Sequence, residues 1–284
     1  MTLQLVTPVA ADVDALGDIC YRAFKDISDR HGFPSDFDSP EFARMVLGSL
    51  VQDETMYRVA ARLDGKLVGS NFMELSDGAS GIGPVSVHPP AQSGGVGRAM
   101  MEDVLRHARE SGIERVRLMQ DSFNMTSLAL YSSLGFDTKA PVALMEPSPA
   151  ESPNVRRATS GDLDAVEELS SRIYRVSRSH SVESHLSDPF TPFVYEKGGR
   201  VTAYFVPGIV GHGAGESEEE MAELVLHTFT QVPPMIGLFF CPLAEGSLYR
   251  RFLSAGCRNR KVMNLMALGP YEEPQGVWLP SIGY

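Results

Sequence analysis

The chain has 284 residues, of which 43% are hydrophobic and 21% are charged, a mix typical of globular rather than disordered proteins. This length is close to twice the roughly 150 residues of an average domain, which predicts two domains. The 36 acidic residues outnumber the 25 basic ones and give a net charge of −11, whereas phosphate backbones bind clustered Lys and Arg. We therefore expect no nucleic-acid partner.

Two further functional classes lose support from the sequence. No window approaches the roughly 18 uncharged apolar residues of a membrane span, and the start of the chain lacks the basic and apolar regions of a leader. We expect a cytoplasmic location and no membrane partner.

The three cysteines, Cys20, Cys241 and Cys257, are too few for a disulfide framework and lack metal-ligand spacing. We interpret them as small core residues and expect no metal site.

A weak internal repeat divides the chain. The sequence ADVDAL at 11–16 returns as GDLDAV at 161–166. Each copy follows a short predicted strand and precedes a helical hydrophobic period, so Asp12 and Asp162 are predicted N-terminal helix caps. Between the copies, Pro141–Asn154 is rich in Pro and Ser, which predicts an extended linker. We place the domain boundary between residues 147 and 148.

Within the first half, the elements alternate between strand and helix patterns. Two β-rich runs, Tyr57–Leu63 and Lys66–Leu75, meet at Asp64-Gly65, which is a strong hairpin signal. A third strand is predicted at Ile82–Val87, and Arg98–Glu110 has the periodicity of an amphipathic helix. The later predicted elements are a strand at Arg115–Met119, a helix at Thr126–Leu134 and a strand at Phe136–Met145. This order predicts an α/β fold with a mixed central sheet flanked by helices.

The most informative segment is Val85–Arg98, where a strand runs through a glycine-rich loop into the start of a helix. Glycines allow sharp turns that expose successive N–H groups, and a helix N-terminus adds unsatisfied donors and partial positive charge. This combination can hold a pyrophosphate, although a plain connector remains an alternative. The patterns G-x-G-x-x-G and G-x-x-x-x-G-K-[ST] are absent, so nicotinamide cofactors and nucleoside triphosphates lose support.

Two motifs resemble those of the GNAT acetyltransferase superfamily. Gln92–Gly97 (QSGGVG) matches the acetyl-CoA loop [Q/R]-x-x-G-x-[G/A] of that family. Asn124–Tyr131 (NMTSLALY), followed by Gly135-Phe136, matches a second family element, N-x-x-[A/S]-x-x-L-Y. The resemblance covers residues 3–147 and implies acetyl-CoA as co-substrate.

The resemblance also implies roles for single residues. The pantetheine arm would lie along the strand that bears Val85, Ser86 and Val87, with the Val87 amide against the acetyl carbonyl. Tyr131 matches the family tyrosine that protonates the departing thiolate. Asn124 matches the asparagine near the pantetheine, and a helix N-cap is an equally good local explanation. The predicted cofactor-binding residues are Val85, Ser86, Val87, Gln92, Ser93, Gly94, Gly95, Val96, Gly97, Arg98, Asn124, Ser127 and Tyr131.

The general base is not fixed by the sequence, because an alkyl ammonium must lose a proton before it attacks and several groups could accept that proton. Glu74 is our candidate, acting through water. Asp121 and His88 are alternatives, and each of the three also has a plain structural explanation.

The insertion at 29–41 lies where GNAT enzymes usually shape the acceptor site. Phe33 and Phe37 are candidates to wall an amine, and Asp36 or Asp38 to attract its charge. A surface loop with helix caps at Asp38 or Ser39 is the alternative.

The second half resembles a degenerate copy of the same domain. Gly211–Gly215 replaces the phosphate loop and leads into Glu218, Glu219 and Glu220, whose charges would repel a pyrophosphate. Phe252 stands where Tyr131 stands in the first half and has no proton to donate. The tail from Gly269 to Tyr284 is predicted to be extended and packed. In some tandem-GNAT aminoglycoside acetyltransferases a terminal carboxylate enters the active site, so the Tyr284 carboxylate is a further catalytic candidate.

Together these observations predict a catalytic GNAT domain at 1–147 and a degenerate GNAT-like domain at 148–284. The expected activity is direct acetyl transfer from acetyl-CoA to a primary amine of a small molecule, because no cysteine is placed as an acyl carrier. The alternatives are a peptide or protein N-terminal acetyltransferase and a non-catalytic acyl-CoA sensor. The expected partners are the small-molecule amine and a second copy of the chain in a homodimer.

Overall fold

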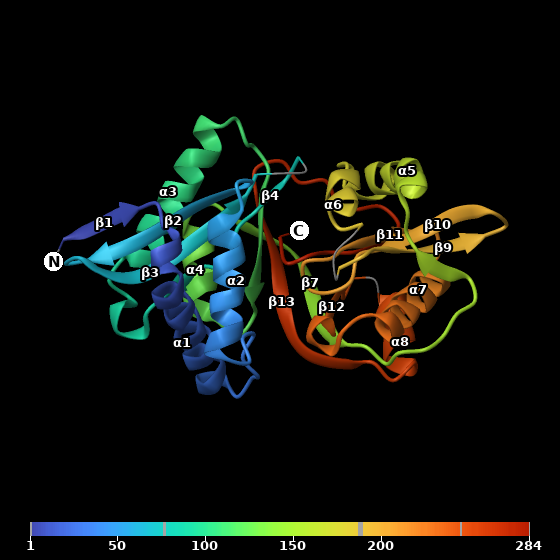
Figure 1. Cartoon of the computed structure of the whole chain (residues 1–284), viewed down its shortest axis with the longest axis horizontal. Helices are drawn as coiled ribbons and strands as arrows, with labels where there is room; N and C mark the ends of the chain where they lie inside the picture. The colour runs from blue at the N-terminus through green and yellow to red at the C-terminus, as the bar shows by residue number, and fades with distance from the viewer. Residues whose placement is uncertain (1, 76–77, 187–189, 245, 284) are drawn as a thin grey trace. The chain divides into compact units, whose positions relative to one another are not determined.

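The computed structural model describes residues 2–75, 78–186, 190–244 and 246–283 (Figure 1). The chain folds into two compact units. Unit 1 holds the described residues of 1–76, 80–116 and 123–136, and unit 2 holds those of 77–79, 117–122 and 137–284. The units therefore divide the chain differently from the sequence repeat, and the boundary between 147 and 148 stays a prediction about that repeat.

Unit 1 is built on a four-stranded sheet in the order β1-β2-β3-β5. The predicted hairpin is confirmed, because β2 pairs antiparallel with β3 and Leu63 lies opposite Lys66. Asp64 and Gly65 both have positive φ angles, of 48° and 83°, as a tight two-residue hairpin turn requires. The strands are β1 (Leu3–Val6), β2 (Met56–Leu63), β3 (Lys66–Glu74) and β5 (Ser86–Val87).

Helices cover both faces of this sheet. On one face, Leu16 and Leu47 from two helices share a buried cluster with Phe72 of β3. On the other face, Asn71 donates from its side chain to the Met101 sulfur at 3.3 Å, because neighbouring strand residues point to opposite sides. The helices are α1 (Val13–His31), α2 (Pro40–Gln52), α3 (Val96–Glu110) and α4 (Met125–Ser133).

Unit 2 contains a sheet with the same strand order plus one more strand. The order β8-β9-β10-β11 repeats β1-β2-β3-β5, and β14 pairs with β11 at the far edge. The repeat detected in the sequence is thus visible in the fold. The elements are β8 (Val155–Arg157), α5 (Leu163–Tyr174), α6 (Ser179–Ser184), β9 (Phe193–Lys197), β10 (Arg200–Phe205), β11 (Gly213–Gly215), α7 (Glu218–Gln231) and β14 (Val277–Leu279).

A third sheet combines strands from both sequence halves, in the order β12-β7-β13-β6-β4. The predicted linker Pro141–Asn154 is wrong in its first part, because 141–146 belong to β7 between β12 and β13. Val142 and Leu144 pack on one face and Ala143 and Met145 on the other, so burial on both faces outweighs the proline signal. The remaining elements are β4 (Ser80–Gly81), β6 (Val116–Asp121), β7 (Asp137–Glu146), β12 (Phe239–Pro242), α8 (Gly246–Ser254) and β13 (Arg258–Leu268).

The two repeated aspartates cap short 3₁₀ turns, η1 (Ala10–Asp12) and η3 (Ser160–Asp162), rather than the helices that follow. The Asp12 carboxylate accepts from the Val9 N–H at 3.1 Å, and the Asp162 carboxylate accepts from the Thr159 N–H at 2.8 Å. This is the reciprocal half of a capping box. The other 3₁₀ turns are η2 (Pro89–Ala91) and η4 (Pro234–Ile236).

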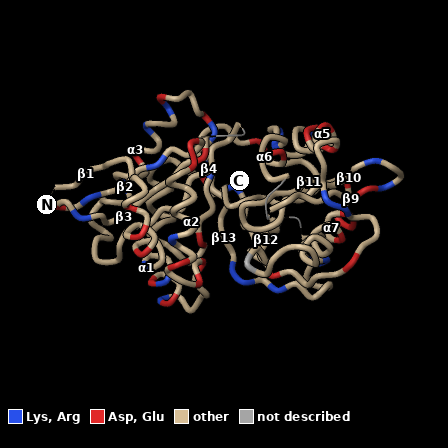
Figure 2. The backbone as a smooth tube through the Cα atoms, in the orientation of Figure 1, with Lys and Arg blue, Asp and Glu red and all other residues tan. Residues whose placement is uncertain are grey.

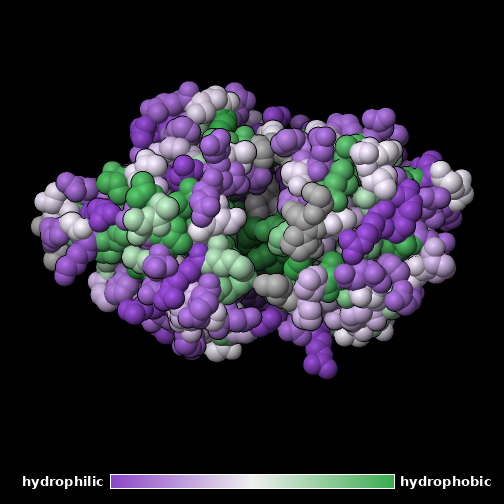
Figure 3. Space-filling view, viewed as in Figure 1, coloured by the Kyte–Doolittle hydropathy of each residue, from purple (hydrophilic) through white to green (hydrophobic). Residues whose placement is uncertain are grey.

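The surface is mixed in charge and mostly hydrophilic. Figure 2 shows acidic and basic positions interspersed along most elements, and Figure 3 shows small green patches within a largely purple face. Val9, Met45 and Met125 are among the scattered exposed apolar side chains. Among the described residues, no helix is long and apolar enough to cross a bilayer. Cys20, Cys241 and Cys257 are buried, as predicted for small core residues.

Candidate functional site

The strand that precedes the glycine-rich loop is interrupted by a bulge. Ile82 lies opposite Met73, and Ser86 lies opposite Ser70. The five residues 82–86 therefore lie opposite only the four residues 70–73 of β3. The extra residue falls within 83–85 and breaks the continuous strand predicted at Ile82–Val87. Bulges re-aim the backbone and are common beside functional sites.

The backbone of Val87 faces away from β3. The His88 N–H donates to the Val68 oxygen at 2.8 Å, and alternation along an antiparallel pair then turns the polar groups of Val87 outward. The Gln92 side chain confirms this orientation, because its amide donates to the Val87 oxygen at 3.1 Å. Since β5 ends the strand order of this sheet in the described part of the chain, the outward edge at Val87 is open.

The loop after this strand presents a series of backbone donors. Ser93 and Gly95 have positive φ angles of 63° and 82°, and Ser93 is strained there because it is not glycine. The first hydrogen bond of α3 joins the Ala99 N–H to the Gly95 oxygen at 3.0 Å. The N–H groups of 96–98 therefore precede the helical ladder. No acidic residue lies in the first turn of α3, so the helix dipole is free to attract an anion.

Helix α4 lies against the start of α3. A Cβ placed on Gly97 would be 3.6 Å from Leu130 Cδ2 and 3.6 Å from Val87 Cγ2, so three elements meet at this glycine. The Arg98 guanidinium donates to the Ser133 hydroxyl at 2.6 Å. Tyr131, next to Leu130 on α4, is 8% exposed. The structure thus gathers the strand end, the loop and the tyrosine helix within unit 1.

The sequence is compatible with two roles for Asn124, a contact with the pantetheine or a helix N-cap. Its side-chain oxygen accepts from the Ser127 N–H at 3.1 Å, and the Ser127 hydroxyl donates to the Asn124 backbone oxygen at 3.0 Å. Both residues therefore fix the start of α4. Their contact with a pantetheine stays a prediction.

The candidate bases are placed differently. Glu74 ends β3 opposite Met56, whereas Val87 lies opposite Gly69, so about 16 Å of strand separates the two positions. Asp121 forms an ion pair with Lys261 at 2.6 Å, with side chains only 9% and 1% exposed. This buried pair, which the sequence reasoning missed, gives Asp121 a structural role. Tyr284 lies outside the described residues, so its carboxylate stays a prediction.

The insertion between α1 and α2 contributes an aromatic stack. Phe33 stacks on Phe123 with centroids 4.3 Å apart, and His31 lies 5.4 Å from the same ring. Phe123 directly precedes the Asn124 motif, so Phe33 lies beside the segment that the motif marks. Phe37 instead packs in the core, 8% exposed and 5.1 Å from Phe24, and its role as the wall of an amine site stays a prediction.

The corresponding edge of the second sheet is closed. Gly213 and Gly215 of β11 lie opposite Leu279 and Val277 of β14, so their outward polar groups face a strand of the tail. The Tyr174 hydroxyl contacts the Gly213 oxygen at 2.7 Å and the Leu279 oxygen at 2.6 Å. The prediction that Gly211–Gly215 forms a loop is therefore wrong for Gly213–Gly215. The prediction of an extended, packed tail is confirmed for β14.

The helix after β11 has neither the loop nor the open N-terminus of α3. Strand β11 ends at Gly215 and α7 starts at Glu218, whereas β5 ends at Val87 and α3 starts at Val96. Ser217 caps α7 and three glutamates fill its first turn (Figure 2). The partial positive charge at the N-terminus of α7 is thus already balanced by these three glutamates.

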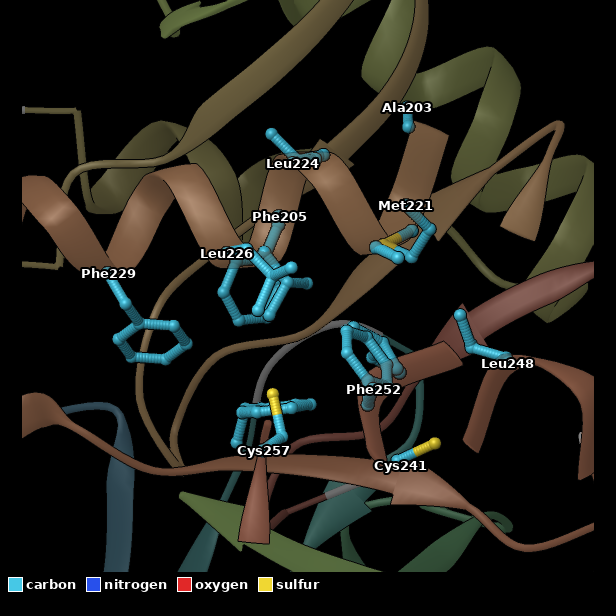
Figure 4. Packing of buried hydrophobic residues seen from close by; sticks show 14 of the residues in the cluster. Ala203, Phe205, Met221, Leu224, Leu226, Phe229, Cys241, Leu248, Phe252 and Cys257 are labelled. Atoms are coloured by element: carbon cyan, nitrogen blue, oxygen red, sulfur yellow. The ribbon is translucent and has the colours of Figure 1, made fainter. Parts of the chain in front are cut away.

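Phe252 on α8 is a core residue. It is fully buried, and its ring lies 4.8 Å from Phe239 in an edge-to-face contact. Figure 4 shows it among Leu248, Cys241 and Cys257 in the hydrophobic cluster of unit 2. This position offers no polar group for catalysis.

Comparisons with known proteins agree with this geometry. The family model described as Acetyltransferase (GNAT) family matches residues 21–136. A mycothiol acetyltransferase from Saccharomonospora viridis is 30% identical over 136 residues, which span 45% of this chain and 43% of that protein. An IAA acetyltransferase from Azospirillum brasilense is 30% identical over 106 residues, which span 36% of this chain and 68% of that protein. The match to the mycothiol acetyltransferase thus spans less than half of that relative's length.

Two solved structures share the fold over nearly the whole chain. A putative acetyltransferase from Pyrococcus horikoshii has a TM-score of 0.75 at 16% identity, covering 96% of this chain and 91% of its own. A tandem GNAT protein from the clavulanic acid biosynthesis pathway has a TM-score of 0.60 at 15% identity, covering 95% of this chain and 100% of its own. At these identities the likeness concerns the fold alone.

Proposed function

The chain belongs to the GNAT acetyltransferase family, and we propose that it transfers the acetyl group of acetyl-CoA directly to a primary amine of a small molecule. The observation that carries this proposal is the open edge at Val87, which runs into a loop of exposed N–H groups at the start of α3. The corresponding edge of the second sheet is covered, because β14 pairs with β11.

The residues of the loop fit a CoA pyrophosphate. The N–H groups of Ser93–Arg98 donate to its oxygens, and the partial positive charge of the α3 N-terminus adds to the attraction. Gly95 supports the loop through its left-handed backbone, at φ 82°. The outward polar groups of Val87 suit a pantetheine amide that lies along the edge like an added strand.

The reaction exchanges a C–S bond for a C–N bond. The Val87 N–H stabilises the negative charge that develops on the acetyl oxygen as the amine attacks. Tyr131 gives its phenolic proton to the departing sulfur, so the thiol leaves neutral. The proton lost by the amine passes to solvent, and Glu74, remote from Val87 along β3, accepts it only through water.

The proposal assigns one working site to each chain. The second half contributes the strand β13, whose Lys261 forms an ion pair with Asp121 of β6, and this aspartate lies three residues before the Asn124 motif.

The aromatic stack of Phe33 and Phe123 suits a small acceptor molecule with an apolar part beside its amine. The mycothiol acetyltransferase relative makes amines of thiol-containing metabolites a first group to screen.

Replacing Tyr131 with Phe tests this mechanism. We expect kcat to fall by about 100-fold, as is usual for loss of a general acid, with little change in the Kd of CoA. The control is Tyr57→Phe, because Tyr57 donates its hydroxyl to Asp103 of α3 at 2.7 Å and has no part in the site. An unchanged kcat in Tyr131→Phe would remove the proposed acid. Tight CoA binding by a wild-type protein that acetylates no amine would indicate a sensor.

A further inference from the structure

Arg178, in the connection between α5 and α6 of unit 2, is buried, and no carboxylate of the described residues forms an ion pair with it. Only 6% of the residue is exposed, and its Nε atom is inaccessible and has no hydrogen-bond partner. Within the described ranges, no carboxylate, carbonyl or hydroxyl accepts from its guanidinium. Arginine is rarely buried to this degree unless it is paired, because desolvation of the charge is costly.

Two acidic groups of unit 2, Glu167 and Glu216, are engaged with partners other than Arg178. The Glu167 carboxylate accepts hydroxyl hydrogen bonds from Ser171, Ser177 and Ser179, including one of 2.6 Å from Ser179. Its pKa is lowered by these three hydroxyls, and Arg178 is not among the causes. Glu216 is held by Arg200 and Arg172, at 2.7 Å and 3.1 Å. The charge of Arg178 is therefore not neutralised by either of these glutamates.

A polar chain lies within the electrostatic reach of Arg178. His212 is fully buried, and its ring nitrogens meet the Tyr204 hydroxyl at 3.1 Å and the Ser181 hydroxyl at 3.2 Å. Burial lowers the pKa of His212 well below its usual value, and the charges of Arg178 and His185 lower it further. The imidazole is thus neutral and both its hydrogen-bond partners are hydroxyls, so neither His212 nor these partners supply a negative charge to Arg178.

We propose that Arg178, together with the Ser181 hydroxyl beside His212, forms a binding site for a small oxyanion, the carboxylate or phosphate group of a ligand. The guanidinium supplies parallel N–H donors that match either group. A hydroxyl can complete the shell as donor. Its residues belong to unit 2, whereas those of the acetyl-transfer site belong to unit 1, so the second half gains a ligand of its own.

Thermal unfolding of the full chain tests the proposal, with sodium phosphate and sodium acetate as probes and sodium chloride at equal ionic strength as the reference. Each titration is repeated in a Gly95→Glu background, because phosphate can also bind the loop at α3. The test variant is Arg178→Met. The matched control is Arg175→Met, since Arg175 is exposed and donates to the Gln275 side chain at 2.7 Å.

We expect phosphate or acetate to raise the Tm of the Gly95→Glu protein and of Arg175→Met until the site is saturated. In Arg178→Met, the same rise in Tm should require an anion concentration at least about tenfold higher. Which of the two anions acts distinguishes a phosphate ligand from a carboxylate one. Without anion, Arg178→Met should unfold at the same temperature or about 3 °C higher, because an unpaired buried charge is removed. A Tm lowered by several degrees would reveal an internal partner, and an equal anion response in Arg178→Met would also overturn the proposal.

Discussion

Strands β5 and β11 hold the same place in two sheets of the same strand order, and each is followed by a helix. Strand β5 has a bulge before it, an open outer edge and a long loop to α3. Strand β11 keeps a continuous register with β10, is covered by β14 and joins α7 within two residues. The shared fold therefore supports a cofactor site only where the edge is free and the loop is long enough to present its N–H groups.

Glycine content alone does not separate the two segments. Both are glycine-rich, but Gly95 uses a left-handed backbone, whereas Gly213 and Gly215 lie in an extended strand. A Cβ on Gly215 would come within 2.8 Å of Ala203 Cβ, so this glycine allows close packing of β10 and β11. The same residue type thus exposes backbone donors in one half and brings strands together in the other.

The largest expected effect concerns the closed edge. Trp278 of β14 is 4% exposed and meets the Tyr174 ring edge-on with centroids 6.0 Å apart. Trp278→Ala should lower the free energy of unfolding by about 3–5 kcal/mol, measured by chemical denaturation. Acetyl-CoA should still bind to the fraction that remains folded. A loss below about 1 kcal/mol would show that the tail does not seal this sheet.

The next largest effect concerns the open loop. Gly95→Glu places a carboxylate in the proposed phosphate cradle and should weaken acetyl-CoA binding by at least about 100-fold, measured by calorimetry. Gly65→Glu is the matched control, because Gly65 has φ 83° against 82° for Gly95 and both have no heavy atom within 4 Å of an added Cβ. Equal affinity in the two variants would contradict the location of the cradle.

The smallest effect concerns the two capping aspartates. Asp162 is paired with Arg156, and this guanidinium, with the Thr159 donors, lowers the pKa of Asp162 to about 2. Because its folded pKa lies below its unfolded value of about 4, Asp162 stabilises the fold at neutral pH and loses this contribution as pH falls from about 4 to 2. Asp162→Asn should therefore cost about 1–2 kcal/mol at pH 7, allowing for the exposure of Arg156, and almost nothing at pH 2.

The counterpart Asp12→Asn should cost less, because Asp12 accepts one hydrogen bond from Arg62 and one from the Val9 N–H, whereas Asp162 accepts two from Arg156 and two from Thr159. Urea unfolding of both variants across this pH range measures the difference. A pH-independent cost for Asp162→Asn would contradict the assigned ion pair.

Local signals predicted much of the fold. The hairpin at Asp64-Gly65, the periodic helix α3 and the short helix α4 appear within two residues of their predicted bounds. The errors lie where distant partners decide. The prolines of 141–154 indicate a linker, whereas the strand predicted at Phe136–Met145 overlaps it, and the pairing of β7 with β12 and β13 decides for the strand. The tail is predicted only as extended, and its pairing with β11 makes it the strand β14.

The candidate site follows the same division. The positions of the motifs Gln92–Gly97 and Asn124–Tyr131 could be predicted from the sequence, because the residues of each motif are adjacent in the chain. The contact of Gly97 with Val87 and Leu130 joins three separate segments and could not be predicted. The Lys261 pair with Asp121 also lies beyond sequence reasoning, because Lys261 follows Arg258, Asn259 and Arg260, a polar run typical of an exposed strand end.

Calorimetric titration of the wild-type chain with acetyl-CoA tests the difference between the two halves most directly. The open edge at β5 and the covered edge at β11 predict one binding site per chain. Two sites of similar affinity would contradict the closure of the second half, and no binding at millimolar ligand would contradict the proposed site in the first.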